Sequence, residues 1–390
     1  MKRTAQNPLH QRVQIAGSAG ADTSPDLLGT AHDVVAEVVR GVLEQGGGLV
    51  LAAGKEPRRK GATDGRGALV FDWTALEAAH ATIGSGRATW KAAGQPPILI
   101  VTSEKAEADI PAERRTLWQD LLRSGAIGLH YIQAGSRAAA LIRERQARLG
   151  DVLVILGGGS GVEHLADLYG NARRSVIPLD LPLGASRRDG LGGAGRIAQL
   201  ARAEPERFIQ LRPEFRAQAG TLLARLGTSG GSAPAGEIAA NVLAMLAAVE
   251  RPNVFYVRLL NAAHADCPNV ETFFRQVVDP VVADLGYERI EMGTDASKRG
   301  FMNVEIFESL HYAAAVVVDV TGLRANCFIE LGYALGREHR TIVSAQDGTI
   351  LPFDEQAIPT HFWNVGGSLD EQREKLRTFW AKNIDRDPLV

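Results

Sequence analysis

Short apolar runs alternate with longer amphipathic stretches along the first half of the chain. Several of these runs are uninterrupted, as in a parallel sheet that helices cover on both faces. They predict strands at Val13–Ala16, Leu49–Ala52, Ile98–Thr102, Leu129–Ile132, Val152–Leu156 and Val176–Leu179. The stretches between and after them predict helices at about Ala31–Gln45, Pro111–Arg123, Ser136–Arg148, Val162–Tyr169 and Ala194–Arg202. This order is typical of α/β units around a parallel sheet.

The composition changes at residues 228–236, where glycine, serine and alanine predominate, as in a flexible linker. Helices are predicted on either side of it, at Pro213–Leu226 and Glu237–Glu250. The second helix has no charged residue over positions 238–249. We therefore expect it to bury a broad face against a domain or a second chain, and it is a candidate contact surface.

A second α/β series follows. It predicts strands at Val254–Val257, Ala314–Val320 and Thr341–Ser344, and helices near Val270–Leu285, Asn303–His311, Cys327–Arg337 and Asp370–Lys382. The expected fold class is therefore α/β, with two doubly wound parallel-sheet domains. We place these domains at residues 10–205 and 251–390, with a helical linker region at 206–250.

The length, composition and net charge of the chain narrow the class of protein. The chain has 390 residues, enough for two domains, and its 45% hydrophobic and 23% charged residues are the mix of a globular protein. A formal net charge of −2 provides no basic field, so we expect neither nucleic acid nor a membrane as a direct partner. Two cysteines and histidines without metal-ligand spacing make a bound metal unexpected. No secretion signal or long apolar span is recognisable, which predicts a cytoplasmic protein.

Two predicted strands of the first domain end in glycine-rich turns. The first strand runs into Gly17 and Ser18, and the fifth runs into Gly157, Gly158, Gly159, Ser160 and Gly161 and then directly into a helix. Glycines let the backbone approach a ligand closely, and a helix start offers unpaired amides to a phosphate. Both turns therefore predict nucleotide binding, although a plain strand-to-helix turn also uses glycine. A third glycine-rich piece could add charge-assisted contacts from Arg187 and Arg188.

These turns, together with Val176–Leu179, resemble the SLOG group. That Rossmann-like group includes cytokinin-activating phosphoribohydrolases and the nucleotide-sensing modules of bacterial defence proteins. The resemblance covers about residues 10–205. The phosphoribohydrolases need a glutamate at the end of a Pro-Gly-Gly-x-Gly-Thr-x-x-Glu pattern, and Leu165 takes its place here. A leucine can neither transfer a proton nor stabilise a cation, so the resemblance implies a binding and sensing module.

The second domain carries one isolated acidic residue in an apolar helix. Glu330 is the only charged side chain between Arg324 and Arg337, and it follows Asp319 at the end of the preceding predicted strand. A carboxylate in apolar surroundings is costly unless it is paired or used, and α/β active sites gather at the carboxyl ends of strands. Glu330 is therefore the best catalytic candidate, with a structural pair to Arg324 or Arg258 as the alternative.

Residues Asp319–Ala334 resemble the signature of the nucleoside 2-deoxyribosyltransferase-like and TIR-like domains of bacterial immune effectors. The resemblance covers about residues 252–365 and implies a flavodoxin-like or TIR-like sheet. In those families the glutamate that matches Glu330 attacks an anomeric carbon or supports cleavage of the nicotinamide–ribose bond of NAD. Both reactions break an N-glycosidic bond through an oxocarbenium-like transition state, which one carboxylate can stabilise.

Other polar residues at the same predicted edge are candidates for the site. Release of a purine base needs an acid, and Asp319 is the candidate for that role; nicotinamide leaves as a neutral molecule and needs no strong acid. Asn326 is expected to cap the helix that carries Glu330. The candidate substrate-binding residues are Tyr256, Arg258, Asn303, Glu305 and Asn326.

The two resemblances together predict a ligand-activated effector. The first domain would sense a nucleotide-derived signal of the cyclic ADP-ribose or cyclic oligonucleotide type, and the second would cleave NAD as its substrate, without a cofactor. The setting they imply is antiphage defence, with activation through a homo-oligomer or filament. Two alternatives stay open: a nucleoside 2-deoxyribosyltransferase or nucleoside hydrolase, and a non-catalytic nucleotide sensor that acts through partners.

Overall fold

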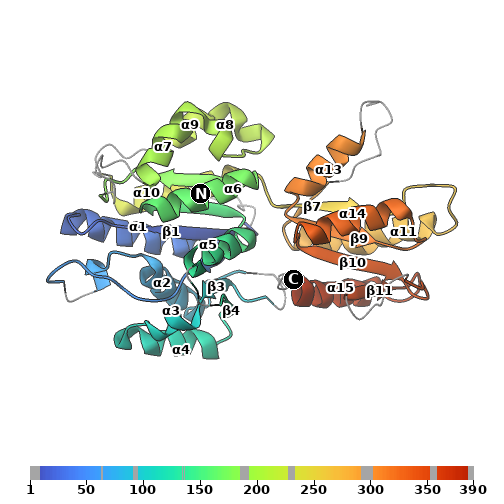
Figure 1. The fold of residues 1–390 in the computed structure, drawn as a ribbon, viewed down its shortest axis with the longest axis horizontal. Coiled ribbons are helices and arrows are strands. Elements are labelled where there is room, and N and C mark those ends of the chain that lie inside the picture. Colours follow the sequence, from blue (N-terminus) through green and yellow to red (C-terminus); the bar gives the residue numbers. More distant parts are fainter. Residues whose placement is uncertain are drawn as a thin grey trace, which may run out of the picture. The chain divides into compact units, whose positions relative to one another are not determined.

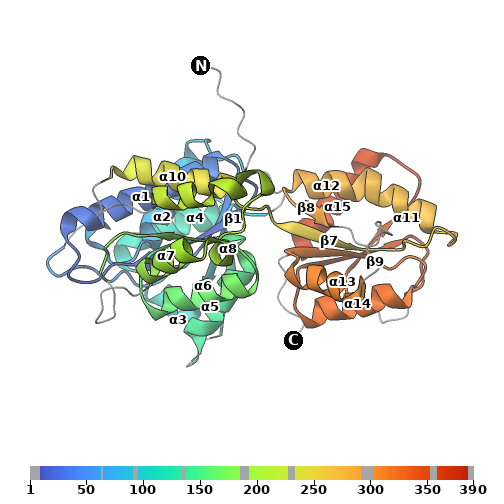
Figure 2. The ribbon, with the colours of Figure 1, turned by 90° about the horizontal axis from the view of Figure 1, so that it is seen from above.

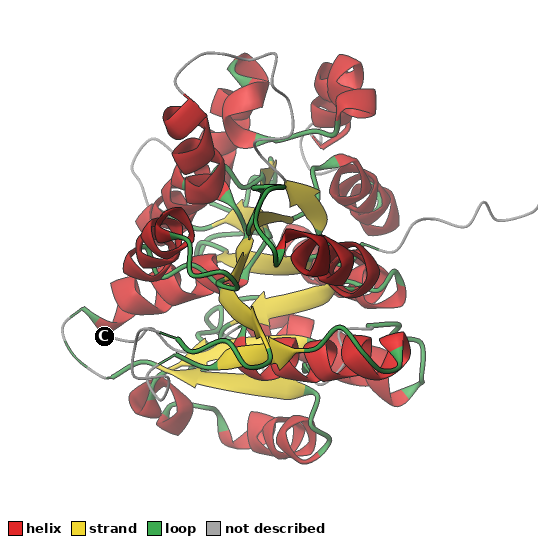
Figure 3. Ribbon diagram, turned by 90° about the vertical axis from the view of Figure 1, so that its right-hand side faces the viewer, coloured by secondary structure: helices red, strands yellow, loops and turns green. Residues whose placement is uncertain are grey.

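The computed structural model describes residues 9–62, 65–90, 95–133, 135, 137–184, 193–226, 233–290, 302–351 and 358–384. The chain forms two compact units, divided in sequence between Glu250 and Arg251. Each unit is a parallel sheet between layers of helices (Figure 1 and Figure 3). This confirms the predicted fold class of two doubly wound α/β domains.

The first sheet has six parallel strands. They are β1 (Arg12–Ser18), β2 (Gly48–Leu51), β3 (Ile98–Thr102), β4 (Ile127–Tyr131), β5 (Val152–Gly157) and β6 (Val176–Leu179). Their spatial order is β4-β3-β2-β1-β5-β6, so the chain builds outward from β1 and then restarts at β5 on its other side. The register pairs Val13 with Val152 and Ser18 with Gly157, which places the two glycine turns next to each other.

Helices cover both faces of this sheet (Figure 2). One face packs on α1 (Pro25–Glu44), α2 (Asp72–Gly84), α4 (Arg115–Arg123) and α10 (Ala235–Ala248). The other packs on α5 (Ala138–Leu149), α6 (Ser160–Asn171) and α7 (Ala194–Ala203). Shorter pieces complete the unit: α3 (Glu104–Ala108), α8 (Pro205–Phe208), α9 (Ala219–Leu226) and 3-10 turns at Gly65–Gly67, Ala112–Arg114 and Pro213–Gln218.

The structure contains a helix that the sequence pattern does not predict. α2 is rich in alanine and has no clear apolar stripe, yet Trp73 and Leu76 are buried and the helix lies against α1. α1 itself begins at Pro25 rather than near Ala31. Ser24 caps it by accepting a hydrogen bond from the Leu27 amide at 3.3 Å, and this extends the helix by six residues at its start.

The segment 206–250, predicted as a linker region, packs onto the first unit. α10 lies so close to α1 that a Cβ on Gly41 would come 2.3 Å from a methyl carbon of Leu243. The apolar side chains of α10, such as Val242 and Met245, are buried in the core of this unit. The uncharged helix is therefore covered within the unit, and the contact with a second chain suggested by its sequence is not needed to explain it.

The second sheet has five parallel strands. They are β7 (Asn253–Val257), β8 (Glu288–Ile290), β9 (Ala315–Asp319), β10 (Thr341–Gln346) and β11 (Thr360–Trp363), in the order β11-β10-β9-β7-β8. This is the flavodoxin-like order, in which the first strand lies between the second and the third. β8 and β11 were not predicted, because both are short edge strands with polar or exposed positions instead of an apolar run.

Two helical layers enclose the second sheet. One contains α11 (Cys267–Phe273), a π-helical turn (Phe274–Val278), α12 (Asp279–Asp284) and α15 (Leu369–Asn383). The other contains α13 (Met302–Tyr312) and α14 (Ala325–Gly336). Glu330 therefore belongs to the α13–α14 layer.

Candidate functional site

Each sheet has a topological switch point, where neighbouring strands connect onward in opposite directions. In the first unit it lies between β1 and β5, and in the second between β7 and β9. Ligands of open α/β sheets bind beyond the carboxyl ends of the strands at such points. The predicted glycine turns follow β1 and β5, and Glu330 lies in α14, which follows β9. Both candidate sites thus lie where this topology favours a ligand.

The glycine turns of the first unit pack against each other's backbone. The Gly158 amide donates to the Ser18 carbonyl at 2.7 Å. A Cβ on Gly17 would come 1.9 Å from the Leu156 carbonyl oxygen, and one on Gly157, whose φ is +57°, would come 2.2 Å from the Ser18 oxygen. Glycine is therefore required at these positions by strand packing, whether or not a ligand binds beside them.

We expect Gly17→Ala to lower the free energy of unfolding of the first unit by about 3 kcal/mol, because the added methyl group overlaps the Leu156 carbonyl. Gly170→Ala in α6 is the matched control, since its Cβ would meet nothing within 4 Å. Replacing this helical glycine should raise stability by about 0.5–1 kcal/mol. Urea unfolding measures both variants, and equal stabilities would contradict the packing argument.

The start of α6 lies beside these turns. Gly159 precedes the helix and Ser160 is exposed at its first position, so the backbone amides there are near solvent. Leu165, at the place of the phosphoribohydrolase acid, is 4% exposed and lies in the hydrophobic core. Glu163 accepts a hydrogen bond from the Gly193 amide at 3.1 Å. At the place of the phosphoribohydrolase acid this turn therefore holds a buried leucine and no catalytic group.

Gly193, near the end of the third glycine-rich piece (residues 184–194), packs against the glycine turn that follows β5. Gly193 has a φ of +63°, and a Cβ there would come 2.4 Å from the carbonyl oxygens of both Gly157 and Gly158. The predicted phosphate contacts Arg187 and Arg188 lie outside the described residues. Gly193 therefore closes against the glycine turn that follows β5.

Asp319 ends β9 and is fully buried. Its Oδ2 accepts hydrogen bonds from Ser344 Oγ and Trp363 Nε1, both at 2.8 Å, and its Oδ1 accepts one from the Thr321 amide at 3.0 Å. Burial raises the pKa of this carboxyl above its usual range, although the three donors oppose the shift. Because it is enclosed and saturated with donors, Asp319 holds three segments of the sheet edge together and is not placed to protonate a leaving group.

Glu330 occupies the second turn of α14. Its side chain is half-buried, and no hydrogen bond or ion pair within the described part of the chain reaches it. Burial alone raises the pKa of this carboxyl above its usual range. The structural alternative does not apply to Arg258, which pairs with Glu271 instead. Glu330 is thus a desolvated carboxylate without a structural task among the described residues.

The face of α14 that carries Glu330 turns toward α13. Asn326, Glu330 and Tyr333 follow one another at spacings of four and three, so they share one face of the helix. The Tyr333 hydroxyl lies 2.7 Å from His311 Nδ1, and the Tyr333 ring packs edge-on against Phe307. Both partners belong to α13, so Glu330 lies on the side of α14 that faces this helix.

Three predicted substrate residues belong to the same layer as Glu330. Asn326 is exposed one turn before it, and the first turn of α13 contains Asn303 and Glu305. Glu305 is exposed, and the Asn303 side chain lies outside the described atoms. These three positions therefore lie in the first turns of the two helices of the layer that carries Glu330.

The other two predicted substrate residues face the opposite layer. Tyr256 is buried there, and its hydroxyl donates to Asp279 Oδ1 of α12 at 3.1 Å. Arg258 lies over the Phe274 ring at 5.2 Å and pairs with Glu271 of α11. Both side chains thus lie on the other side of the sheet from the layer that carries Glu330, because alternate residues of a strand point to opposite faces.

The start of α14 also differs from the prediction. The cap residue is Arg324 rather than Asn326, and it makes no side-chain cap hydrogen bond. Gly322 and Leu323 have φ values of +77° and +50° and turn the chain early, so Asn326 already lies inside the helix. The first amides of α14 are consequently without a side-chain cap, on the helix that carries Glu330.

The sequence pattern alone did not reveal a cluster of arginines in the first unit. Arg58, Arg66 and Arg114 line a pocket of about 650 Å³ near the start of α2. A signal was present, since Arg58, Arg59 and Lys60 are adjacent in the loop after β2. Only the fold shows that Arg114, from a distant segment, lies in the same pocket.

In the described ranges, no group of three or more histidine, cysteine, aspartate or glutamate residues could hold a metal ion. None of the helices described here is both long and apolar enough to cross a membrane.

Comparison with known proteins places the first unit in a family. A family model described as "ATP nucleosidase Cap17-like, N-terminal" matches residues 9–233. Two curated relatives, both named ATP nucleosidase Cap17, come from Escherichia coli strain KTE188 and from Escherichia coli. Each is 28% identical over 200 residues, which are 51% of this chain and 37% of the relative. The chain thus matches little more than a third of the length of these relatives, and no solved structure matches it.

The matched region contains both glycine turns and the arginine-lined pocket, and it ends before the second unit begins. Because the family model covers more than half of the 390 residues, the chain belongs to the Cap17-like N-terminal family.

Proposed function

We propose that the chain is a nucleotide-controlled effector that cleaves an N-glycosidic bond, with Glu330 as the catalytic carboxylate. The observation that carries this proposal is the position of Glu330, half-buried and without a partner in the described residues, at the switch point of the second sheet. The printed name of the relatives, ATP nucleosidase, denotes the same kind of reaction. Their family match ends at residue 233, so the assignment of catalysis to the second unit rests on the site itself.

The proposed chemistry follows from the charge of this carboxylate. As the bond between the ribose carbon and the base nitrogen breaks, its electron pair moves to the base and the ribose becomes an oxocarbenium-like cation. A desolvated carboxylate interacts with such a cation far more strongly than one in water. Glu330 would stabilise the cation or bond to the anomeric carbon, and water would then complete hydrolysis.

The surroundings of Glu330 favour a leaving group that needs no proton. Nicotinamide in NAD is a cationic pyridinium and leaves as a neutral molecule, whereas adenine leaves readily only when it is protonated. Asp319, the acid suggested by the sequence, is enclosed by three donors in the interior. We therefore propose NAD as the substrate, cleaved at the nicotinamide–ribose bond.

Adenine release from ATP is the second candidate, and the name of the relatives favours it. This reaction would require a proton donor other than Asp319. The two candidates differ in the product, nicotinamide or adenine, so one chromatographic assay separates them.

The first unit supplies the proposed control. Its glycine turns at the β1–β5 switch point would bind a nucleotide-derived signal of the cyclic ADP-ribose or cyclic oligonucleotide type. The resemblance of both units to defence modules supports a role in antiphage defence, in the cytoplasm and through a homo-oligomer.

The test is release of base by the purified chain. NAD and ATP are supplied separately, each with and without cyclic ADP-ribose-type and cyclic oligonucleotide ligands, and nicotinamide and adenine are measured. Nicotinamide release that requires Glu330 is the expected result. Release of neither base under any ligand, or equal release by Glu330→Gln, would overturn the proposal.

The pH dependence of the reaction offers a separate check. Glu330 must be ionised to act, and burial raises its pKa, so kcat/KM should fall as the pH is lowered through a value above the ordinary range of a glutamate. No acid is required for nicotinamide, so the alkaline side should be flat between about pH 7 and pH 9. Initial rates over this range and down to about pH 4 test both limbs. An alkaline decline would favour adenine release and a protonated acid.

A further inference from the structure

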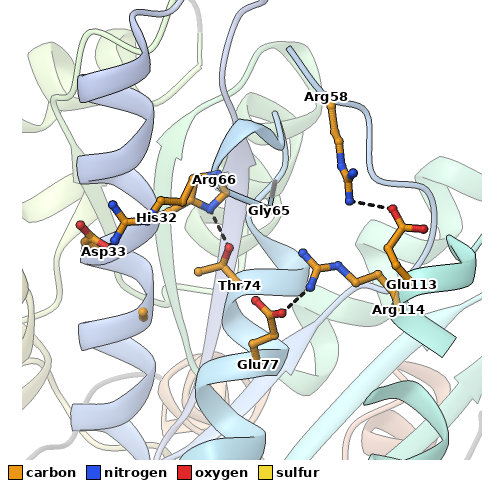
Figure 4. A pocket seen from close by; sticks show the side chains of 10 residues that line it. His32, Asp33, Arg58, Gly65, Arg66, Thr74, Glu77, Glu113 and Arg114 are labelled. Carbon is orange, nitrogen blue, oxygen red and sulfur yellow. Dashed lines mark hydrogen bonds and ion pairs between the residues drawn. The ribbon is translucent and has the colours of Figure 1, made fainter. Parts of the chain in front are cut away.

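The loop after β2 forms a polar hollow in the first unit, and no residue of the glycine turns lines it. It is lined by α1, the start of α2, the loop itself and the 3-10 turn Ala112–Arg114 (Figure 4). Its volume of about 650 Å³ is in the range of small-molecule sites. Figure 4 shows Arg58, Arg66 and Arg114 arriving at this hollow from three different segments.

A buried carboxylate holds two of these arginines. The side chain of Glu56 is fully buried, and its Oε1 accepts from Arg114 Nε at 3.0 Å and Nη2 at 2.6 Å. Its Oε2 accepts from Arg58 Nε at 3.1 Å and Nη2 at 2.5 Å. One carboxylate thus fixes two guanidinium groups in the interior.

Three further carboxylates line the first hollow: Glu77, Glu113 and Asp33, the last of them paired with Arg66 at 2.8 Å. Arg114 also pairs with Glu77, and Arg58 pairs with Glu113 at 2.7 Å. The Glu77 and Glu113 side chains are 53% and 54% exposed, whereas those of Arg114 and Arg58 are 9% and 25% exposed. Exposed ion pairs are weak, so an arriving anion can replace these carboxylates while Glu56 keeps the arginines in place.

Several guanidinium groups retain free donors. The hydrogen bonds of Arg58 use Nε and Nη2, and Arg66 uses only Nη2, toward Asp33 at 2.8 Å. Within the described residues, Arg58 Nη1 and Arg66 Nε and Nη1 have no acceptor. Arginine forks of this kind match the oxygens of phosphate groups.

A second hollow, of about 460 Å³, continues from the first. The two share Asp33 and Arg66, and the second is also lined by Arg59 and by Pro25, Asp26 and Gly29 at the start of α1. Arg59 is half-buried, and no acceptor or carboxylate in the described part of the chain contacts its side chain. The 20-residue helix α1 directs its positive end toward this hollow.

The floor of the first hollow is neutral and fixed. His32 Nε2 lies 2.9 Å from the Ala68 carbonyl oxygen and Nδ1 lies 2.6 Å from Thr74 Oγ1. Burial lowers the pKa of His32, so the ring is neutral at physiological pH. The cationic groups available to an anion are therefore the arginines.

We propose that these joined hollows bind the linked phosphates of a nucleotide, with Arg58 and Arg114 as the fixed anchor and Arg59 and Arg66 as the contacts to the second hollow. The site is lined by the loop after β2 and by α1 rather than by residues of the glycine turns, and it does not depend on Glu330. The recognised chemistry is two or more linked phosphates, which either a nucleotide or a free pyrophosphate presents.

The test uses the full chain carrying Glu330→Gln, so that no probe is consumed. Calorimetric titrations with ADP, ATP and inorganic pyrophosphate are compared between this chain and one that also carries Arg59→Gln and Arg66→Gln. Both positions lie outside the buried Glu56 cluster, so the fold should persist. Arg87→Gln is the matched control, because Arg87 is an exposed arginine that pairs with Glu44 outside both hollows.

We expect the Arg59→Gln, Arg66→Gln chain to bind at least about tenfold more weakly and the Arg87→Gln chain to bind unchanged. Tighter binding of ADP and ATP than of pyrophosphate would identify a nucleotide site, and equal binding would identify a site for the phosphates alone. Binding that the double change leaves unaltered, or no binding of any probe, would overturn the proposal.

A labelling experiment on the unmodified chain avoids any question of folding. Phenylglyoxal modifies accessible arginines, and peptide mass analysis reports each one. Pyrophosphate or ATP should protect Arg59 and Arg66 but not Arg87. Equal labelling of all three in the presence and absence of the probe would contradict the site.

Discussion

Glu330→Gln should lower kcat/KM for nicotinamide release from NAD by about 10³-fold while leaving the fold intact. The amide has the shape of the carboxyl group but carries no charge to stabilise a ribosyl cation. No hydrogen bond or ion pair within the described residues depends on Glu330, so the substitution removes no structural contact known there. Burial of its charge is a cost to the folded state, so the free energy of unfolding should stay equal or rise slightly.

Glu371→Gln is the matched control for this variant. Glu371 is exposed in the first turn of α15, in the opposite helical layer. Its replacement by glutamine removes one negative charge, as Glu330→Gln does. Its rate should equal that of the unmodified chain. A Glu330→Gln chain that keeps a tenth or more of the rate would contradict the catalytic role of Glu330, and one that unfolds at a much lower urea concentration would show a structural role.

The fold was predictable where burial produces an uninterrupted apolar run. β5 and β9 lie inside their sheets with both faces covered, and their sequences predict strands directly. β8 and β11 lie at sheet edges, where one side of the strand has no neighbour and polar residues are tolerated. α2 escaped prediction because alanine fits a helix packed closely on α1 without producing an apolar stripe.

The candidate sites were predictable one residue at a time but not as groups. Glu330 stands out because a lone charge in an apolar helix is expensive wherever the helix packs. Whether Tyr256 or Asn326 lies beside it depends on which face of the sheet each one meets, and that is set by strand register and by the turn at Gly322. Arg58 and Arg114 line one hollow although they are far apart in the sequence, and no local sequence pattern predicts such a pairing.

Asp319 illustrates the same limit, since it resembles a catalytic acid in sequence and a buried anchor in structure. We expect Asp319→Ala to lower the free energy of unfolding of the second unit by about 3 kcal/mol. The change leaves the Trp363 indole N–H and the Thr321 amide buried without an acceptor and opens space between β9, β10 and β11. Asp347→Ala, at an exposed position after β10, is the control and should leave the urea midpoint unchanged.

The conservative change Asp319→Asn distinguishes a structural role of Asp319 from a role as a general acid. An asparagine keeps the shape but must turn its NH₂ group toward one of the three donors, so it should cost about 1–2 kcal/mol of stability. At a temperature where the variant is folded, its rate of nicotinamide release should stay within about threefold of the unmodified chain, because the Asp319 carboxyl is enclosed by its three donors. If the folded Asp319→Asn chain instead lost as much activity as Glu330→Gln, the carboxyl would have to reach the leaving group. The enclosure of Asp319 by Ser344, Trp363 and Thr321 would then have to open during turnover.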